Sequence, residues 1–284
     1  MINRNLPSIL DGVDSLIEEL FEIRVCRLAR DLPKRKLRCL VRSPGPGINL
    51  PEAIEQMYRR IESNWGRAAP NGKGENWRWA RQETISERNN GPEIRFARAV
   101  ANFADNTWAN HIPTASGLSL IGGSFSRERS RAVDLGHLDG SRHELIELKL
   151  GQKCQSAVFA AFEIMISGLL YIFSHHHSQA YKYDPTRQYI RSSVIELIAL
   201  CPPHCYAAGN FQWLKDDINH GIHLVTRYAA SELSMRFAFQ ELPTFSWGDQ
   251  EHRDLIEYRR TQDPKLRNRL KSKVDTALRG RSYV

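Results

Sequence analysis

The chain has 284 residues, of which 41% are hydrophobic and 25% charged, a composition typical of a soluble globular protein with one large or two small domains. Its formal net charge of +8 and isoelectric point of about 9.4 favour an anionic partner, of which nucleic acid is the commonest. The sequence contains no repeat or low-complexity segment, and no long apolar run follows its first charges, so we expect no signal peptide. Five irregularly spaced cysteines exclude a disulfide framework and indicate a reduced, cytoplasmic protein.

Residues 1–88 are predicted to form a helical N-terminal region. Apolar side chains recur at three- and four-residue spacing between Leu6 and Leu32, and a second helix is expected from Pro51 to Trp65. Trp77 and Trp79 alternate with arginines, and such indoles either stack on bases or pack a small domain onto its neighbour, which we favour. These helices are also the expected surface for a homodimer or a larger assembly.

A new element begins after the Asn89-Asn90-Gly91 break, because Pro92 suits the first turn of a helix and Glu93 follows it. Residues Gly117 to Ile121 are then predicted to be the first strand of a central sheet.

The stretch from Arg131 to Leu150 predicts a β-hairpin. Its first strand is expected over Arg131–Leu138 and its second over His143–Leu150, because Asp139-Gly140-Ser141 has the chemistry of a tight turn. A two-residue loop at Gly140-Ser141 sets Asp134 opposite Glu147. A loop at Asp139-Gly140 keeps Asp134 on that face, and a three-residue loop moves it to the other face.

Period two in the second strand places Glu147 and Lys149 on one face, together with Asp134 if the register is right. Two adjacent carboxylates repel unless a proton or a cation joins them, and Mg²⁺ prefers such hard oxygen ligands. The lysine is then placed to hold a water or to stabilise developing negative charge. The alternative is a solvated sheet face with a cross-strand ion pair.

At these residues the chain resembles the PD-(D/E)XK nuclease superfamily, which has the restriction-endonuclease-like fold. Asp134 stands at the aspartate of the motif and Glu147-Leu148-Lys149 at (D/E)-X-K, whereas Val133 replaces the proline of the family name. The resemblance implies ligation of Mg²⁺, or of Mn²⁺, by Asp134, Glu147 and the carbonyl of Leu148. It also implies that Lys149 activates water or stabilises charge.

In the resembled family the helix before the hairpin often adds another acidic metal ligand, and Glu93 is the candidate here. The alternative role of Glu93 is to complement the dipole of its own helix. Beyond the hairpin, polar residues open the next helix close to the strand end. The candidates among them for contacting nucleic acid are Gln152, Lys153 and Gln155.

The helix expected from Ala157 to Phe173 is apolar nearly all round, so it should be buried, and Glu163, its one charged residue, should pair with an arginine. The histidine run 175–177 is interpreted as a solvated helix end. A strand is predicted over Ser193–Cys201, central and parallel. Cys201 and Cys205, with His204 between them, could begin a zinc site, but the sequence contains no second cysteine pair.

A helix at Asn210–Asn219 and a strand at Met235–Leu242 complete the core. From Pro92 onward the expected order is helix, three strands, helix, strand, helix, strand, which matches the αβββαβ core of the resembled superfamily with one added helix and strand. Residues 253–284 carry ten Lys or Arg against four acidic residues, and two amphipathic helices are expected there around Pro264. The candidates in this tail for contacting nucleic acid are Arg267, Arg269 and Lys271.

The sequence therefore predicts an α/β protein with a mixed central sheet flanked by helices. Its expected parts are a helical N-terminal extension (1–88), a nuclease-like core (89–245) and a basic helical tail (246–284). The expected activity is Mg²⁺-dependent hydrolysis of nucleic acid, DNA more than RNA, with no membrane involved. The alternatives are a non-catalytic module that binds nucleic acid or protein on the same fold, and the nuclease subunit of a larger defence or repair assembly.

Overall fold

The computed structural model describes residues 9–20, 49–65, 76–89, 91–114, 132–150, 157–181, 183, 189–207, 210–242 and 247–284. Within them the chain forms a mixed α/β structure around a six-stranded sheet whose strand order follows the chain. The strands are β1 (Trp108–Pro113), β2 (Ala132–Asp139), β3 (Arg142–Leu148), β4 (Val194–Cys201), β5 (Ser234–Glu241) and β6 (Ser282–Tyr283). The helices are α1 (Val13–Leu20), α3 (Leu50–Trp65), α4 (Pro92–Phe103), α5 (Ala157–His176), α6 (Ser178–Tyr181), α7 (Gln212–Ala229), α8 (Asp249–Thr261) and α9 (Pro264–Arg279).

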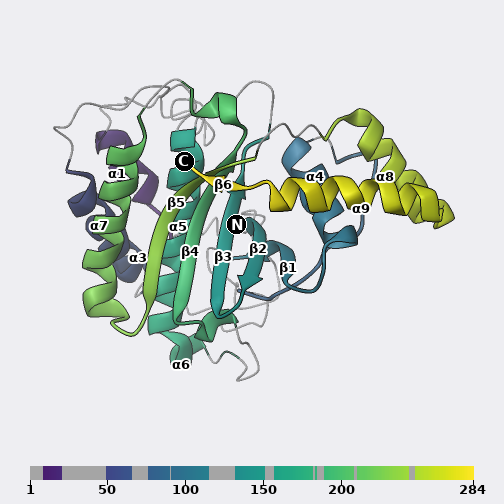
Figure 1. The fold of residues 1–284 in the computed structure, drawn as a ribbon. Helices are drawn as coiled ribbons and strands as arrows, with labels where there is room; N and C mark the ends of the chain where they lie inside the picture. The colour runs from purple at the N-terminus through teal and green to yellow at the C-terminus, as the bar shows by residue number, and fades with distance from the viewer. Residues whose placement is uncertain are drawn as a thin grey trace, which may run out of the picture.

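The pairing of neighbouring strands changes from antiparallel to parallel at β3. Strands β1, β2 and β3 pair antiparallel, β3, β4 and β5 pair parallel, and β6 returns antiparallel to β5 (Figure 1). The two parallel pairs require long crossovers, and α5 and α7 supply them. The mixed sheet predicted from the sequence is confirmed.

Helix α5 is the central helix of one core layer. It has the length and composition of a membrane-spanning helix, but 94% of its most apolar window is buried inside the protein. It packs on β3 and β4, where its side chains join the inward faces of the sheet and of α7 in one hydrophobic cluster. Burial of the helix on nearly all sides explains why its sequence shows no polar face.

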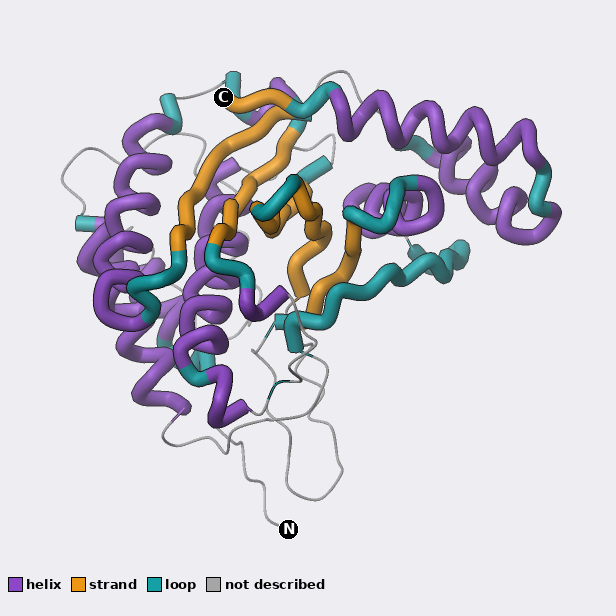
Figure 2. Tube along the Cα trace, turned by 60° about the horizontal axis from the view of Figure 1, so that its bottom comes forward, coloured by secondary structure: helices purple, strands orange, loops and turns teal. Residues whose placement is uncertain are grey.

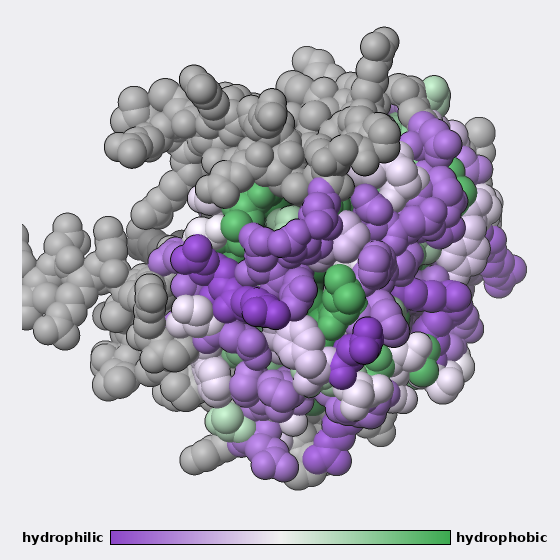
Figure 3. Space-filling view, turned by 90° about the vertical axis from the view of Figure 1, so that its left-hand side faces the viewer, coloured by the Kyte–Doolittle hydropathy of each residue, from purple (hydrophilic) through white to green (hydrophobic). Residues whose placement is uncertain are grey.

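The N-terminal helices complete that layer rather than building a core of their own. Helix α3 packs along α7, and buried residues of α1 and α3 belong to the same cluster as those of α5 and the sheet (Figure 2). Trp77 is also fully buried there, against Tyr171, so the packing role favoured for this indole is confirmed. The outer side of this layer is mainly hydrophilic, with apolar side chains in small groups (Figure 3).

The other face of the sheet is covered by α4 and by the basic tail. Residues of α4, α8 and α9 share a second cluster with Ile146, Leu148 and Leu200 of the central strands. Helices α8 and α9 are the two helices expected around Pro264; they pack on each other, and Figure 1 shows them beside α4. The tail is therefore packed against the core along one side, not a free terminus.

The tail ends in a charge network on the hairpin. Arg281 donates to the buried carboxylate of Glu144 at 3.0 Å and lies over the ring of Trp108, while the Tyr283 hydroxyl donates to buried Glu196 at 3.1 Å. These contacts dock the short strand β6 against β5, and the sequence contains no strong signal for it.

Several element predictions need correction. The first strand is Trp108–Pro113, a segment with one β-branched residue and a proline that becomes a strand by pairing with β2; the predicted strand at Gly117–Ile121 lies outside the described residues. Helix α7 continues ten residues past its predicted end at Asn219, and β3 ends at Leu148 rather than Leu150. Of the long helix predicted from Leu6 to Leu32, the structure describes Val13–Leu20.

Gly221 allows the close packing of α7 on α3, and we expect Gly221→Ala to destabilise the protein. A Cβ added at position 221 would lie 2.7–3.0 Å from three atoms of Ile54. One of these atoms is the Cβ of Ile54, which can move only if the α3 backbone moves with it. Overpacking of this kind costs about 1–3 kcal/mol, against a gain of up to about 1 kcal/mol in helix propensity. Urea denaturation measures the net loss.

The control is His223→Ala, an exposed position on the same helix, which should change stability little. Equal or greater stability of Gly221→Ala would show that α3 and α7 are not in tight contact at this point.

Candidate functional site

The hairpin adopts the two-residue loop that the site requires. Gly140 has φ +60°, a conformation that glycine accepts without strain, and Asp139 pairs with Arg142 across the turn. The pairing continues in this register to Leu135 and Ile146. The next position of each strand is Asp134 and Glu147, so the predicted alignment of the two carboxylates is confirmed.

Two carboxylates hold the backbone amides at the end of β3. The Leu148 amide donates to Oδ2 of Asp134 at 3.0 Å, and the Leu150 amide donates to Oε1 of Glu93, also at 3.0 Å. Alternate amides of an extended chain point the same way and lie about 7 Å apart. Asp134 and Glu93 are therefore fixed along the same side of the strand, with Glu93 supplied by the first turn of α4.

Lys149 connects the strand to the helix above it. Its ammonium forms ion pairs with Oε1 of Glu147 and, at 2.8 Å, with Oε2 of Glu163 on α5, and it lies 5.3 Å from the centre of the Phe159 ring. Lys149 and Glu147 are both buried. An arginine was the predicted partner of Glu163; the ion pair that the structure describes joins Glu163 to the lysine of the motif.

One ammonium is thus shared among a surplus of carboxylates, and the pKa values show the resulting strain. Burial raises the pKa of Asp134 to about 6, with Glu163 and Glu93 adding to the effect and Lys149 and the Leu148 amide opposing it. Burial and then Asp134 raise the pKa of Glu147 well above its usual range. For Lys149, the surrounding carboxylates outweigh burial and raise the pKa, so the side chain stays cationic.

The donor set fits a hard divalent cation, since Asp134, Glu147, Glu93 and Glu163 offer carboxylate oxygens. The raised pKa values of Asp134 and Glu147 indicate that these two carboxyl groups need nearby positive charge. In the described residues, however, the group whose metal-binding atoms all lie within 4.8 Å of one another is elsewhere, at Glu62, His176 and His177. A cation bound by Glu147 at the strand end would share that carboxylate with the Lys149 ammonium, which pairs with its Oε1.

The structure describes some of the predicted nucleic-acid-binding residues. Gln152, Lys153 and Gln155 lie outside the described residues. Arg267, Arg269 and Lys271 are on α9, which packs against α4. Arg269 forms an ion pair with Asp254, and Lys271 pairs with Asp275 at 2.7 Å, so part of the tail's positive charge is neutralised within the fold.

The cysteine segment after β4 does not offer the zinc ligands considered from the sequence. Cys201 is a free thiol, and burial raises its pKa to about 12, so it is neutral at physiological pH. Cys205 takes part in a disulfide, so the expectation of reduced cysteines fails at this residue.

Glu163 is the site residue whose role the sequence did not predict. Its isolation as the one charged side chain of an apolar helix marks it as a residue that needs a partner. The identity of the partner depends on which helix face lies over β3, and the spacing of residues within the helix does not contain that information.

We expect Asp134→Asn to remove a pH dependence of stability in metal-free buffer. The folded pKa of about 6 exceeds the ordinary value of 3.8, so the folded state binds this proton more tightly than the unfolded state does. Stability from this group is present below pH 3.8 and is lost as the pH rises through about 6. The asparagine oxygen still accepts from the Leu148 amide.

Urea denaturation with EDTA, from about pH 4.5 to about pH 7.5, measures this effect as the difference between the two proteins. The stability of wild type relative to Asp134→Asn should fall across that range. A stability difference that stays constant with pH would contradict a raised pKa for the buried Asp134 carboxyl group.

Comparison of the chain with models of protein families, with curated proteins and with solved structures finds no match. The functional argument therefore depends on the residues themselves. Four carboxylates and a lysine, drawn from α4, β2, β3 and α5, meet at the end of one central strand.

Proposed function

We propose that the protein is a metal-dependent nuclease that hydrolyses phosphodiester bonds of nucleic acid, with DNA favoured over RNA as the substrate. The observation that carries the proposal is the convergence of Asp134, Glu147 and Lys149 at the end of β3, with Glu93 and Glu163 brought to the same place by α4 and α5. The element order from α4 onward agrees with the αβββαβ core that the resemblance implies.

Each residue has a role that follows from its contacts. Asp134 and Glu147 would hold Mg²⁺ or Mn²⁺, with Glu93 and the carbonyl of Leu148 as further oxygen ligands; the ion would supply Lewis-acid stabilisation of the phosphoryl oxygens and a more acidic water. The Leu148 amide fixes one oxygen of Asp134 and leaves the other available.

Lys149 acts as a donor in this scheme. Because its pKa is raised, it keeps its proton and cannot accept one from water at physiological pH. It can donate a hydrogen bond to the attacking water or to a phosphate oxygen, and its ion pair with Glu163 would keep the ammonium in place if Glu147 held a metal ion.

The second candidate is a binding module on the same fold. It is favoured by the fact that Lys149 already neutralises Glu147 and Glu163, so the strand end is partly satisfied without a metal. In that case the basic tail would bind nucleic acid and the motif would only hold α5 on the sheet. A third arrangement, in which the chain is the nuclease subunit of a larger assembly, needs the same catalytic residues.

We expect Lys149→Met to reduce cleavage of labelled single- and double-stranded DNA by about 100-fold or more in Mg²⁺ or Mn²⁺, as for loss of one preorganised charge donor. Glu163→Gln should reduce it less, since it loosens the ammonium without removing it. Lys215→Met is the matched control, a half-buried lysine on α7 in the opposite helical layer, and it should cleave like wild type.

Because Lys149→Met leaves buried carboxylates unpaired, binding of Mn²⁺ to the wild type, Asp134→Asn and Glu147→Gln is measured in parallel by calorimetry. Cleavage that depends on all three residues, with Mn²⁺ binding lost in the carboxylate variants, supports the nuclease. Nucleic-acid binding without cleavage or Mn²⁺ binding by the wild type would leave the binding module.

We expect the tail to set the salt dependence of nucleic-acid binding. Arg267→Gln should lower the slope of log affinity against log salt by about 0.9, the effect of losing one phosphate contact. Arg269 and Lys271 already pair with Asp254 and Asp275, so their substitution should change the slope less. The measurement is fluorescence anisotropy across a salt series.

Arg227→Gln is the control, because Arg227 is an exposed arginine on α7 in the opposite helical layer. If Arg267→Gln leaves the slope of the wild type unchanged, or Arg227→Gln lowers it equally, α9 is not the contact surface.

A further inference from the structure

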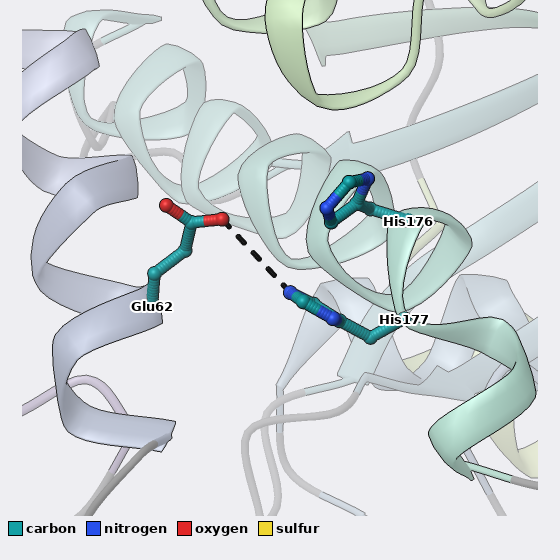
Figure 4. A group of neighbouring side chains, drawn as sticks. All are labelled: Glu62, His176 and His177. Atoms are coloured by element: carbon teal, nitrogen blue, oxygen red, sulfur yellow. Dashed lines mark ion pairs between the residues drawn. The ribbon is translucent and has the colours of Figure 1, made fainter.

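A group of metal-binding side chains lies at the last turn of α5, away from the strand end. His176 is the last residue of α5 and His177 follows it, and Glu62 extends toward them from α3 (Figure 4). One donor atom from each of the three lies within 4.8 Å of the other two, and Oε1 of Glu62 is 3.9 Å from Nε2 of His177. The interpretation of this histidine run as a solvated helix end is therefore incomplete.

His177 is prepared to act as a ligand. Its ring packs against Trp65, at 4.3 Å between centroids, and against Phe173, at 4.6 Å. Its Nε2 is buried and has no hydrogen-bond partner among the described residues.

The third histidine of the run shows the contrast. Both ring nitrogens of His175 have partners, the Ile190 carbonyl at 2.8 Å and a Glu232 carboxylate at 2.8 Å. His175 is thus used within the fold, whereas His176 is exposed and His177 directs its nitrogen toward Glu62.

The electrostatic surroundings favour a cation. The carbonyl groups at the C-terminus of a long helix carry partial negative charge, and α5 ends at His176. Glu62 adds a carboxylate on the facing helix. The position is separate from the strand end, because Glu163 and His176 are thirteen residues apart on α5, about 20 Å along the helix axis.

We propose that Glu62, His176 and His177 bind a divalent ion of the zinc class, with water in the fourth position. Two imidazoles and one carboxylate are typical ligands for such an ion and do not suit Mg²⁺. Coordination at about 2.0–2.1 Å brings tetrahedral ligand atoms to about 3.4 Å from one another, so the donors must close by roughly 1 Å. The exposed side chain of His176 and the half-buried one of Glu62 can make this movement.

The bound ion would join α3 to α5 and so fix the N-terminal helices on the core. This proposal does not depend on nuclease activity. Its test uses the full chain carrying Asp134→Asn and Glu147→Gln, stripped with a chelator and kept in excess Mg²⁺, so that the strand end does not contribute.

Co²⁺ is titrated and followed by its visible absorption, and Zn²⁺ is titrated by calorimetry. We expect one equivalent to bind and the melting temperature to rise. His176→Ala and Glu62→Gln should each weaken binding by about tenfold or more, since loss of a ligand should cost at least as much as loss of a supporting contact. Both variants should melt like the parent in chelator.

His220→Ala, an exposed histidine on α7, is the matched control and should bind like the parent. Binding that is unchanged in His176→Ala and Glu62→Gln would show adventitious association with other surface groups and would overturn the proposal. So would the absence of binding by the parent with Co²⁺ and Zn²⁺ in excess over protein.

Discussion

The ammonium of Lys149 is the contact on which the arrangement of the strand end depends. It pairs with Glu147 of β3 and with Glu163 on α5, so one positive charge at the strand end joins the sheet to the helix that covers it. Removing one partner of a buried ion pair destabilises a protein far more than replacing both partners with apolar residues, because the remaining charge stays desolvated. The lysine therefore occupies, within the protein, the position of the counter-ion that the surrounding carboxylates require. Any external cation at this place competes with it.

Much of this site could be predicted from the chain because it is local. The turn residues Gly140-Ser141 fix the hairpin register, and period two then aligns Asp134 with Glu147 and Lys149. The features that could not be predicted depend on tertiary contacts between elements. Strand β1 owes its conformation to its neighbour rather than to its composition. The pairing of Glu163 with Lys149, and of Glu62 with His177, depends on how α5 lies on the sheet and on α3. The spacing of residues within one helix or strand does not predict how that element packs across its neighbours.

The two proposed ion sites differ in chemistry as well as in place. The strand end offers carboxylate oxygens, which suit a hard ion that keeps part of its water. The end of α5 offers two imidazoles and one carboxylate, which suit a borderline ion such as zinc. A single helix carries both, with Glu163 near its start and His176 at its end. Ligand type alone would let the chain sort two ions, with no need for a difference in cavity size.

The strand order of the sheet has a consequence for how the protein folds. Every strand lies beside its successor in the chain, from β1 to β6, so no strand has to enter between two that are already paired. The sheet can grow from the β2–β3 hairpin by adding one strand at a time, and each addition closes a loop no longer than one crossover. Loop-closure entropy is then lost in small steps, which lowers the contact order relative to folds with interleaved strands. Once the hairpin has formed, the strands that follow it, β4 to β6, can be added in the order in which they are synthesised.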